Sequence, residues 1–583
     1  MTAPVPKSGL RELVRRDGVG PVRCDGKEIL RRIFVTVRDW TWREIAPTQW
    51  ESEVDEGQRT ATLTARHVSD SVDFEWKGLL RVSDDLRSLR FEITGQVLRD
   101  MEVCRLGLVV LHPVESLVDS QVEAIGPQGG HRLTVSGDVA PQPVVNGIPM
   151  AMTEPFSKLV VERSDFGRLE LQFEGDLFEL EDQRNWGDAS FKSYCTPLRL
   201  GFPRALKAGT SIVHRLDATF APTSTARTRE AEARGPARAR PNGRISDRQS
   251  LCGIFPAIGR EWWPCTIHLH QLARQQESAW HHIHFDILGQ GAMTAVRTLL
   301  ESGASTKLQI GIETEDDKLA QELLPLLSEH RESVARLILY GPCASLAPAA
   351  AVEDWRRRLE VGGLRNVAVL AATRGYFVEF NRGAPLDAAV SRIAFPLTAT
   401  VHSDDVDTIR DNVPVIGDMV DAIRSRARLA ELAVVPLALY HPQRPAQGVF
   451  PRELVVPWLT ATLLNTALAR VTSVTLAEDV VDAVGPHDAR TLSFLVCLAG
   501  CAGSEVRPLE AAMPSGLHAG VLRFPGLSAS RILVANLEPR AIPISLERLA
   551  PSVRAATNAM TGDALDFNSE RVNVPAYGVA WLE

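Results

Sequence analysis

Polar and hydrophobic residues alternate in several short segments of the first 220 residues. A period of two is typical of strands that bury one face, and the segments that show it are short and rich in Val, Leu and Phe. Turn residues separate them at 83–85 and 127–130. Helical periodicity is nearly absent, so residues 1–220 are predicted to form a large antiparallel β-sandwich. Its strands are predicted within 28–42, 60–69, 71–83, 88–98 and 102–114.

Residues 221–250 interrupt this pattern. They are rich in Arg, Ala and Pro and contain almost no large apolar side chain. Such a segment cannot bury a core, so a flexible, solvated linker is predicted. Basic runs also occur in proteins that bind nucleic acids, but the acidic balance of the whole chain favours the linker.

Residues 251–510 alternate short apolar strands with amphipathic helical stretches. Eight such units match the number expected for a (β/α)8 barrel. A doubly wound parallel sheet is the alternative, but no Gly-rich phosphate-binding turn follows the first strand, so the barrel is favoured. The eight strands are predicted at 252–258, 281–287, 307–313, 335–341, 366–372, 392–401, 432–440 and 471–478.

Strand patterns return in residues 511–583, which are predicted to form a small C-terminal β-sandwich. The predicted fold class is therefore multidomain, α/β plus β: a sandwich, a TIM-like barrel and a second sandwich. Barrels that carry a β appendage are common among enzymes that act on carbohydrates, and this is an analogy at the level of the fold.

Composition narrows the classes of function. The net charge of -8 and the pI near 6.0 argue against a non-specific nucleic-acid binder and against a membrane-surface protein. The 8 cysteines form no CxxC pair, which argues against a disulfide framework. Residues 1–18 lack an apolar core of signal-peptide length, and the apolar run 492–503 is too short to span a bilayer. A reduced, cytoplasmic protein is expected.

Polar residues at the ends of the predicted barrel strands are the candidates for chemistry, because barrel enzymes place their sites there. Glu379 follows the fifth strand and Glu478 ends the eighth. A pair of carboxylates, one protonated and one ionised, is what hydrolysis of an acetal or a sugar ester needs. The two glutamates are therefore the predicted catalytic pair. The predicted substrate-binding residues near them are Asn381, Arg382, His402, Asp405 and Asp286.

Histidines offer a second hypothesis. The segment 267–271, IHLHQ, is similar to the HxH of metal-dependent barrel hydrolases, and 281–284 adds three more imidazoles. His402 and Asp479 are further possible ligands, but no Lys stands at the end of the fourth or fifth strand to bridge two metal ions. No metal and no cofactor is therefore predicted. A GxSxG elbow is also absent, which argues against an α/β-hydrolase.

The stretch 178–194, FELEDQRNWGDASFKSY, surrounds Trp186 with paired charges. One interpretation is a loop over the barrel mouth, where the indole stacks on a sugar-like ring while Arg184 holds the loop or binds hydroxyls. The other is a salt-bridge network between domains with Trp186 as a packing anchor.

Five segments together resemble the D-apionate lactonases, or apionolactonases, of bacterial apiose catabolism. They are 106–113, 178–194, 376–383, 400–405 and 473–478, and the block from 181 to 192 is the most specific. The resemblance implies hydrolysis of a branched five-carbon aldonolactone, D-apionolactone, to D-apionate.

The chain departs from the family pattern after the eighth-strand glutamate, where Asp479, Val480 and Val481 replace a Thr-Thr-Gly-Trp-like turn, and at Ser403, where Ala is usual. These changes lie at the barrel mouth and leave open a different lactone. A glycoside hydrolase acting on a furanoside and a non-catalytic carbohydrate-binding protein are the alternatives. The expected partner is a small sugar lactone or glycoside, with no nucleic acid and no membrane.

Overall fold

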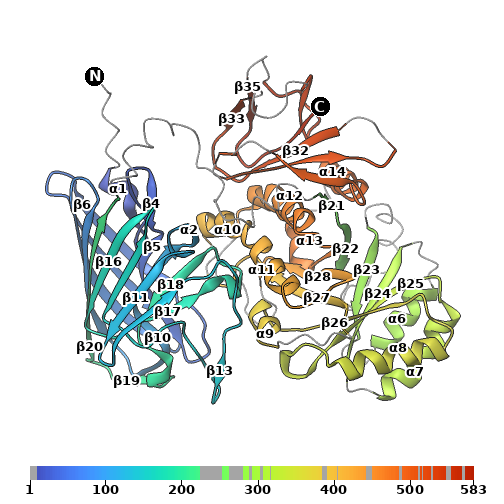
Figure 1. Cartoon of the computed structure of the whole chain (residues 1–583), viewed down its shortest axis with the longest axis horizontal. Coiled ribbons are helices and arrows are strands. Elements are labelled where there is room, and N and C mark those ends of the chain that lie inside the picture. Colours follow the sequence, from blue (N-terminus) through green and yellow to red (C-terminus); the bar gives the residue numbers. More distant parts are fainter. Residues whose placement is uncertain are drawn as a thin grey trace. The chain divides into compact units, whose positions relative to one another are not determined.

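The structure is a computed structural model that describes residues 9–583 except 224–251, 262–279, 288–291, 302–305, 315–316, 384–389, 403–404, 441–449, 485–488, 510–512, 515, 527–529, 546–552 and 567–570 (Figure 1). It contains two compact units. The first comprises Met1–Arg184 and Ala189–Arg234, and the second comprises Asn185–Asp188 and Gly235–Glu583. The predicted linker lies almost wholly outside the described residues. Within those residues, no helix is both long and apolar enough to cross a membrane.

The first unit is a β-sandwich, as predicted. Its seven-stranded sheet has the order β1-β2-β5-β10-β18-β17, with β19 paired to β10, and its nine-stranded sheet has the order β12-β11-β15-β16-β20-β9-β8-β7-β6. The strands of the first sheet are β1 Val14–Arg15, β2 Gly18–Val19, β5 Arg32–Asp39, β10 Met101–Pro113, β17 Glu179–Asp182, β18 Ser190–Tyr194 and β19 Arg204–Leu206. Those of the second are β6 Pro47–Asp55, β7 Thr60–Val68, β8 Asp73–Val82, β9 Ser88–Val97, β11 Gln121–Gly126, β12 Gly129–Thr134, β15 Lys158–Arg163, β16 Gly167–Glu174 and β20 Ser211–Ala221.

Two small hairpins and two short helices complete this unit: β3 Val22–Cys24 with β4 Lys27–Leu30, β13 Val144–Val145 with β14 Ile148–Pro149, α1 Leu10–Leu13 and α2 Val114–Leu117. Burial alternates along the long strands, as in β8, where Phe74, Trp76 and Leu80 are buried between exposed neighbours. These side chains belong to one core shared by both sheets. The period of two therefore predicted the architecture correctly, because each strand buries only one of its faces.

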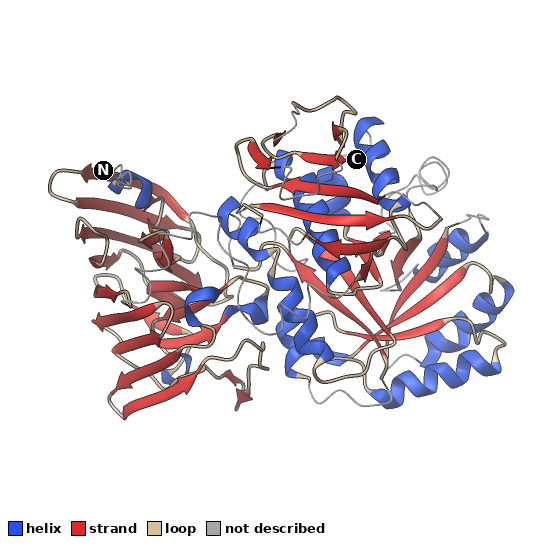
Figure 2. Ribbon diagram, turned by 45° about the horizontal axis from the view of Figure 1, so that its top comes forward, coloured by secondary structure: helices blue, strands red, loops and turns tan. Residues whose placement is uncertain are grey.

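The second unit contains a closed barrel of eight parallel strands, β22 to β29. Figure 2 shows its strands in red with helices in blue around them. The strands are β22 Ala257–Glu261, β23 His282–Asp286, β24 Lys307–Glu313, β25 Val334–Tyr340, β26 Ala368–Ala372, β27 Arg392–Thr398, β28 Glu431–Ala438 and β29 Ser473–Leu476. Because β22 pairs with β29, the sheet is closed, and the doubly wound alternative is excluded.

Helices follow the barrel strands along the described parts of the chain. They are α6 Ala292–Glu301, α7 Asp317–Glu329, α8 Ala349–Val361, α9 Phe377–Arg382, α10 Val406–Asn412, α11 Val415–Arg424, α12 Arg452–Leu468, α13 Glu478–Val484 and α14 Ala489–Gly500. Residues such as Val352, Trp355 and Leu359 of α8 are buried at helical spacing. The amphipathic pattern thus identified the elements that cover the outside of the barrel.

The first predicted barrel strand, 252–258, had the wrong limits. Residues Gly253–Ile254 form β21, which pairs antiparallel with β30 (Glu505–Pro508). The barrel strand β22 begins only at Ala257 and continues to Glu261. Pro256 lies between the two strands and lacks a backbone N–H group for either ladder. Glu261 is therefore part of a barrel strand, which the sequence pattern did not predict.

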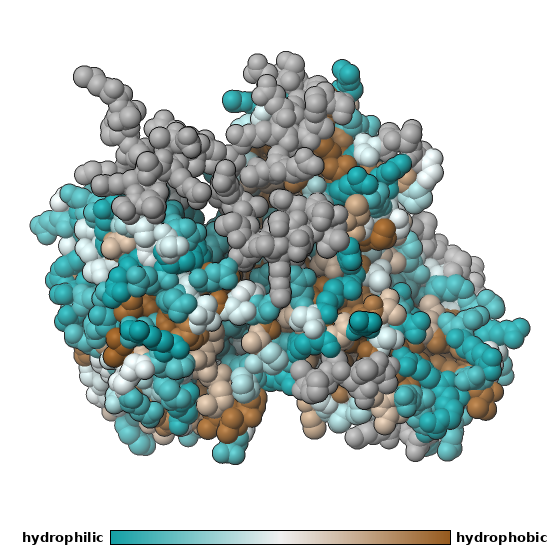
Figure 3. Space-filling model, viewed as in Figure 1, coloured by the Kyte–Doolittle hydropathy of each residue, from teal (hydrophilic) through white to brown (hydrophobic). Residues whose placement is uncertain are grey.

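The chain ends in a six-stranded sheet of order β21-β30-β31-β32-β36-β34 and a two-stranded sheet, β33-β35. Their remaining strands are β31 Leu517–Arg523, β32 Ser530–Asn536, β33 Ile542–Ser545, β34 Ala556–Asn558, β35 Arg571–Val574 and β36 Val579–Leu582. Both sheets contribute to one apolar core, which includes Val534, Val572 and Leu582. The predicted C-terminal β region is therefore present, and its sheet also includes β30 and β21, which precede residue 511. The face drawn in Figure 3 is mostly hydrophilic with scattered hydrophobic areas, as is usual for folded proteins.

Candidate active site

Polar side chains line the inside of the first barrel strands. Gly259 of β22 points inward, because a Cβ added there would lie 2.3 Å from the ring of His282. His282 Nε2 lies 2.9 Å from Thr475 Oγ1 of β29. Since successive residues of a strand point to opposite faces, Glu261 shares the inward face of Gly259. The same alternation places these residues on the inward face: His284 and Asp286 of β23, Gln309, Gly311 and Glu313 of β24, and Tyr340 of β25.

The other side of the barrel interior is mainly apolar beyond an ion pair between Arg336 and Glu431 at the start of β25 and β28. Small and aliphatic side chains of β25 to β28 form a buried cluster there. Its members besides Tyr340 are Ile338, Leu370, Ala372, Ala394, Ala433 and Val435. The interior is therefore divided into a polar side and an apolar side. A ligand with hydroxyl groups and a carbon ring face suits such a division.

A chain of hydrogen bonds and ion pairs runs along the polar side. His284 Nε2 lies 2.8 Å from Asp286 Oδ1. The other oxygen of Asp286 accepts from Arg374 Nη1 at 2.6 Å, and Arg374 Nε donates to Glu313 Oε1 at 2.5 Å. Gln309 Nε2 donates to His284 Nδ1 at 3.1 Å, so the imidazole presents its Nε2–H to Asp286. Arg374, two residues after β26, thereby joins carboxylates of β23 and β24.

Tyr340 and Gly311 define the space around this series of hydrogen bonds and ion pairs. The Arg374 guanidinium carbon lies 3.8 Å from the centre of the Tyr340 ring, and the Tyr340 hydroxyl lies 3.2 Å from His284 Nε2. At Gly311 an added Cβ would lie 1.8 Å from Asp286 Oδ1 and 2.8 Å from the Tyr340 ring. Only glycine at 311 leaves room for both side chains in these positions.

Two carboxyl groups near Arg374 have pKa values shifted in opposite directions. Burial alone would raise the pKa of Asp286, but His284 and Arg374 outweigh it and hold that pKa at about 2. Burial raises the pKa of Glu261 to about 7, and the negative Asp286 and Asp479 add to this rise against His284 and Arg374. At neutral pH, Asp286 is ionised while Glu261 exchanges its proton readily. Such a separation is typical of catalytic acids and bases.

Among the residues that the structure describes, three polar atoms of this region are buried without a hydrogen-bond partner: Arg374 Nη2, Gln309 Oε1 and Asp479 Oδ1. The second oxygen of Asp479 accepts from the backbone N–H of Tyr440 at 2.8 Å, while burial raises the pKa of this carboxyl. A buried polar group without a partner costs about 1–3 kcal/mol. One unpaired donor and two unpaired acceptors are therefore available to a ligand that carries a carbonyl oxygen and hydroxyl groups.

The two predicted catalytic glutamates have different surroundings. The Glu379 carboxylate accepts from the backbone N–H of Tyr376 at 2.7 Å and lies 3.5 Å from Arg382 Nη1, so it caps the N-terminus of its own helix, α9. Glu478 is the first residue of α13, and burial and Asp482 raise its pKa while Arg260 opposes the rise. A catalytic pairing of these two glutamates stays a prediction.

Several predicted binding residues do lie together, around Trp186. The segment Asn185–Asp188 groups with the barrel unit. The Trp186 ring lies 5.5 Å from that of Tyr376 and 5.3 Å from that of His402, and the Arg382 guanidinium carbon lies 6.0 Å from the indole. Asn381 Nδ2 donates to Asn185 Oδ1 at 2.7 Å.

Acidic residues hold this aromatic group in place. His402 Nδ1 donates to a carboxylate oxygen of Asp188, whose other oxygen accepts from Asn412 Nδ2 at 2.9 Å. Asp405, also predicted as a binding residue, caps α10 by accepting from the backbone N–H of Thr408 at 2.9 Å. The contacts of Trp186 fit the packing anchor that the sequence suggested. Stacking of the indole on a sugar ring stays a prediction.

Arg184 lies inside the sandwich unit with its side chain 1% exposed. It forms a bidentate ion pair with Asp182, in which Nε donates to Oδ1 at 2.9 Å and Nη2 donates to Oδ2 at 2.7 Å. Its Nη1 donates to the Gly137 carbonyl at 2.8 Å. Its guanidinium carbon lies 5.0 Å from the centre of the Phe191 ring. Of the two predicted roles of Arg184, these contacts favour holding its loop.

Replacing Arg184 with Leu is expected to lower the free energy of unfolding of the sandwich by about 3–5 kcal/mol, because it leaves Asp182 buried without its cation. Urea denaturation followed by circular dichroism measures this. Arg168→Leu is the control, since Arg168 lies on β16 with its side chain 45% exposed and should change stability by less than about 0.5 kcal/mol. Normal stability of Arg184→Leu with a raised Michaelis constant would instead support direct substrate binding.

Sequence reasoning missed Glu261, Arg374 and Tyr340. Glu261 was missed because the first strand was predicted to end at 258. Arg374 lies two residues beyond the fifth strand, outside any strand or helix. Of the two carboxylates that it binds, only Asp286 was among the site residues predicted from the sequence. The sequence could have indicated Glu261, because a carboxylate two residues after Gly259 lies on the same face of the strand. The histidines of 267–271 lie outside the described residues.

Comparison with known proteins gives one family match. Residues 7–223 match the family described as "D-apionate lactonase, N-terminal domain". The chain is 29% identical over 206 residues to the D-apionate lactonase of Brucella anthropi, which covers 35% of this chain and 32% of the relative. The match thus spans about a third of the length of that curated relative.

Solved structures show more distant likenesses. A β-arabinopyranosidase is 11% identical with a TM-score of 0.37, covering 96% of this chain and 95% of its own. A GH30 endoxylanase from Clostridium papyrosolvens is 9% identical with a TM-score of 0.34, covering 56% of this chain and 96% of its own. At these values the likenesses carry no functional argument.

Proposed function

We propose that this chain, whose residues 7–223 match the D-apionate lactonase N-terminal domain family, is a hydrolase that opens a sugar-derived five-membered lactone at the carboxyl end of its barrel. The observation that carries the proposal is Glu261, with a pKa of about 7, close to an ionised Asp286 and a guanidinium with an unpaired N–H. The specific reaction proposed is D-apionolactone to D-apionate, because the curated relative is named D-apionate lactonase.

Lactone hydrolysis requires three actions. A base removes a proton from the attacking water, a donor stabilises the negative carbonyl oxygen of the tetrahedral intermediate, and an acid protonates the ring oxygen as the C–O bond breaks. A single carboxyl group with a pKa near the working pH serves both as base and as acid. Glu261 has that pKa. In this proposal it takes the proton from water and then gives it to the leaving alkoxide.

Arg374 is the proposed donor to the carbonyl oxygen. Its Nη1 and Nε bind Asp286 and Glu313, which fixes the guanidinium plane, while its buried Nη2 has no partner within the described part of the chain. A donor held in place before the reaction stabilises developing charge without having to reorganise. Asp286 therefore acts as a positioning residue through Arg374.

The unpaired acceptors Gln309 Oε1 and Asp479 Oδ1 are proposed to accept from substrate hydroxyls. Satisfying a buried acceptor discriminates strongly against a substrate that lacks the matching hydroxyl. The apolar side of the barrel, with Leu370 and Val435, would then face the carbon skeleton. Trp186, Arg382, His402, Asn381 and Asp405 remain proposed contributors to substrate binding.

The carboxylate pair from the sequence, Glu379 and Glu478, is the competing assignment for the same reaction. Glu478 retains support from its raised pKa. Glu379 already uses its carboxylate to cap α9. Parallel Glu→Gln variants at 261, 379 and 478 distinguish the two assignments.

The test of the proposed function is an assay of the purified full chain against a panel of aldonolactones, with titration of the acid released. D-apionolactone should be opened faster than five-membered lactones that lack its hydroxymethyl branch. Wild-type protein that opens no lactone above the spontaneous rate would contradict the proposal.

A furanoside-cleaving glycoside hydrolase is the second candidate, because two carboxyl groups with separated pKa values also suit that reaction. Aryl furanosides in the same panel decide between the two. Release of the phenol without any lactone opening would favour the glycosidase.

A further inference from the structure

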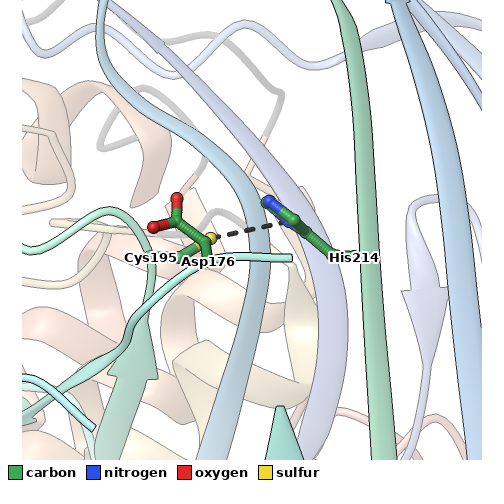
Figure 4. Close-up of side chains that lie close together, drawn as sticks. All are labelled: Asp176, Cys195 and His214. Carbon is green, nitrogen blue, oxygen red and sulfur yellow. Dashed lines mark hydrogen bonds between the residues drawn. The ribbon is translucent and has the colours of Figure 1, made fainter. Parts of the chain in front are cut away.

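A second group of chemically active side chains lies inside the sandwich unit, formed by Asp176, Cys195 and His214 (Figure 4). Asp176 lies between β16 and β17, Cys195 directly follows β18, and His214 belongs to β20. Their ligand atoms all lie within 4.8 Å of one another. Because β18 and β20 belong to different sheets, the group joins the two layers of the sandwich.

We infer that Asp176, Cys195 and His214 bind one divalent transition-metal ion of the zinc type, which links the two sheets. Thiolate and imidazole are the ligands that such ions prefer, whereas Mg²⁺ and Ca²⁺ prefer oxygen ligands alone. Nothing in the lactonase proposal requires this ion.

The geometry fits a tetrahedral ion. Zinc bonds of about 2.3 Å to sulfur and about 2.0–2.1 Å to nitrogen, at a tetrahedral angle, place the two ligand atoms roughly 3.5–3.6 Å apart. Cys195 Sγ and His214 Nδ1 are 3.7 Å apart. The carboxylate is the ligand that has to approach, and Asp176 is the most exposed of the three residues, in a bend after Gly175.

Two glycines provide the space that the group occupies. Gly107 has φ +130°, and a Cβ there would lie 2.3 Å from His214 Cε1 and 2.8 Å from Cys195 Sγ. Gly175 has φ +96°, and its Cβ would lie 1.9 Å from the Val213 carbonyl oxygen and 3.0 Å from His214 Cδ2. Any side chain at 107 would fill the space between the thiol and the imidazole.

The contacts of Cys195 and His214 are long, and the ion would take the His214 Nδ1 lone pair that now accepts from the Leu108 N–H. Cys195 Sγ lies 3.3 Å from the Leu108 carbonyl oxygen, and His214 Nδ1 accepts from the Leu108 N–H at 3.3 Å. Asp176 accepts from the Leu177 N–H at 2.7 Å and from the Thr196 hydroxyl, and Arg204 Nη1 lies 3.8 Å away. Binding the ion replaces the thiol proton of Cys195, which is released to solvent.

A catalytic role of Cys195 does not fit this setting. Its side chain is 0% exposed and part of the apolar core, so no substrate reaches the sulfur. A structural ion is the role that remains.

The experiment measures metal content and cobalt binding on the full chain. After chelation and buffer exchange, the protein should take up about one equivalent of Zn²⁺ by mass spectrometry, and Co²⁺ should give a thiolate-to-cobalt absorption band in the near ultraviolet. Cys195→Ser should abolish the band, and Asp176→Asn should weaken binding by at least about tenfold. Cys104→Ser, which changes another buried cysteine of the same sandwich, should leave both readouts unchanged.

Two further comparisons locate the ion and its effect. A His268→Ala/His270→Ala double variant should still bind one equivalent, since those histidines belong to another part of the chain. Adding Zn²⁺ to metal-free protein should raise the melting temperature of the sandwich by several degrees without changing turnover at 25 °C. The inference is overturned if no equivalent binds, if Cys195→Ser and Asp176→Asn both bind Zn²⁺ as tightly as wild type, or if the double variant loses the ion.

Discussion

Replacing Glu261 with Gln is expected to reduce turnover at pH 7 by at least about a hundredfold, within the range of about 100- to 10,000-fold that a positioned acid–base group contributes. Glutamine keeps the size of the side chain and its hydrogen bonding but carries no titrating proton. Because the pKa of Glu261 is about 7 and the ionised form activates water, kcat/KM of the wild type should rise as pH passes through about 7. This rise of kcat/KM with pH should be absent from the variant.

The same substitution should increase stability at alkaline pH. The pKa of Glu261 is raised in the folded chain above its usual value near 4.5. The protonated carboxyl therefore contributes stability below about pH 4.5, and this contribution is lost as pH rises through about 7. Relative to wild type, Glu261→Gln should gain on the order of 3 kcal/mol between pH 4 and pH 8, measured by denaturant unfolding of the barrel.

A matched control and two competing variants complete this test. Glu322→Gln lies on an exposed position of α7 and should change neither the pH profile nor turnover. If Glu379→Gln or Glu478→Gln costs a hundredfold while Glu261→Gln keeps near-normal turnover, the pair predicted from sequence is the catalytic one and Glu261 is not.

Replacing Arg374 with Lys is expected to lower kcat by about 100- to 1,000-fold while the chain still folds. Lysine keeps the positive charge between Asp286 and Glu313, but its three N–H groups stand on one nitrogen atom and cannot reproduce the planar fork that spans both carboxylates while a separate nitrogen faces the substrate. A loss of that size is typical when one donor to a developing oxyanion is removed. The loss should fall on kcat more than on the Michaelis constant, because the donor acts mainly in the transition state.

The stability of this variant separates catalysis from folding. The free energy of unfolding of Arg374→Met should be lower than that of Arg374→Lys by about 3–5 kcal/mol, because the methionine variant leaves Asp286 buried without a cation. Arg358→Lys on α8 is the control, because its ion pair with Asp354 lies on the helix surface. If Arg374→Lys kept wild-type turnover, the proposed donor role of Arg374 would be contradicted.

The pH dependence of Asp286 has the opposite sign to that of Glu261. The folded-state pKa of Asp286 is lowered to about 2. Its contribution to stability is therefore present above about pH 3.9 and is lost as pH falls toward 2. A barrel that loses stability both below pH 4 and between pH 4.5 and 7 would show both shifts together.

The architecture could be predicted from the chain because its signals are local. A strand with one buried face repeats every two residues and a covering helix repeats about every 3.6, and both patterns follow from which residues meet the core. Eight alternating units were enough to predict the closed barrel that β22 and β29 complete. Strand limits were less accurate, because Pro256 divides a single apolar run between two sheets.

The sequence by itself determined the two β-sandwich regions, the barrel and the candidate residues that follow its strands, among them Asp286. It could do so because residues that are buried on one face of a strand or helix recur at a fixed spacing. Only the tertiary structure decided which candidates meet. Arg374 binds Asp286 and Glu313, which lie on two other strands, and Glu379 turned back to cap its own helix. The pKa of Glu261 and the grouping of Asp176 with Cys195 and His214 likewise arise from contacts between distant segments. No local pattern records such contacts, since electrostatic shifts and ligand geometry depend on distances through space.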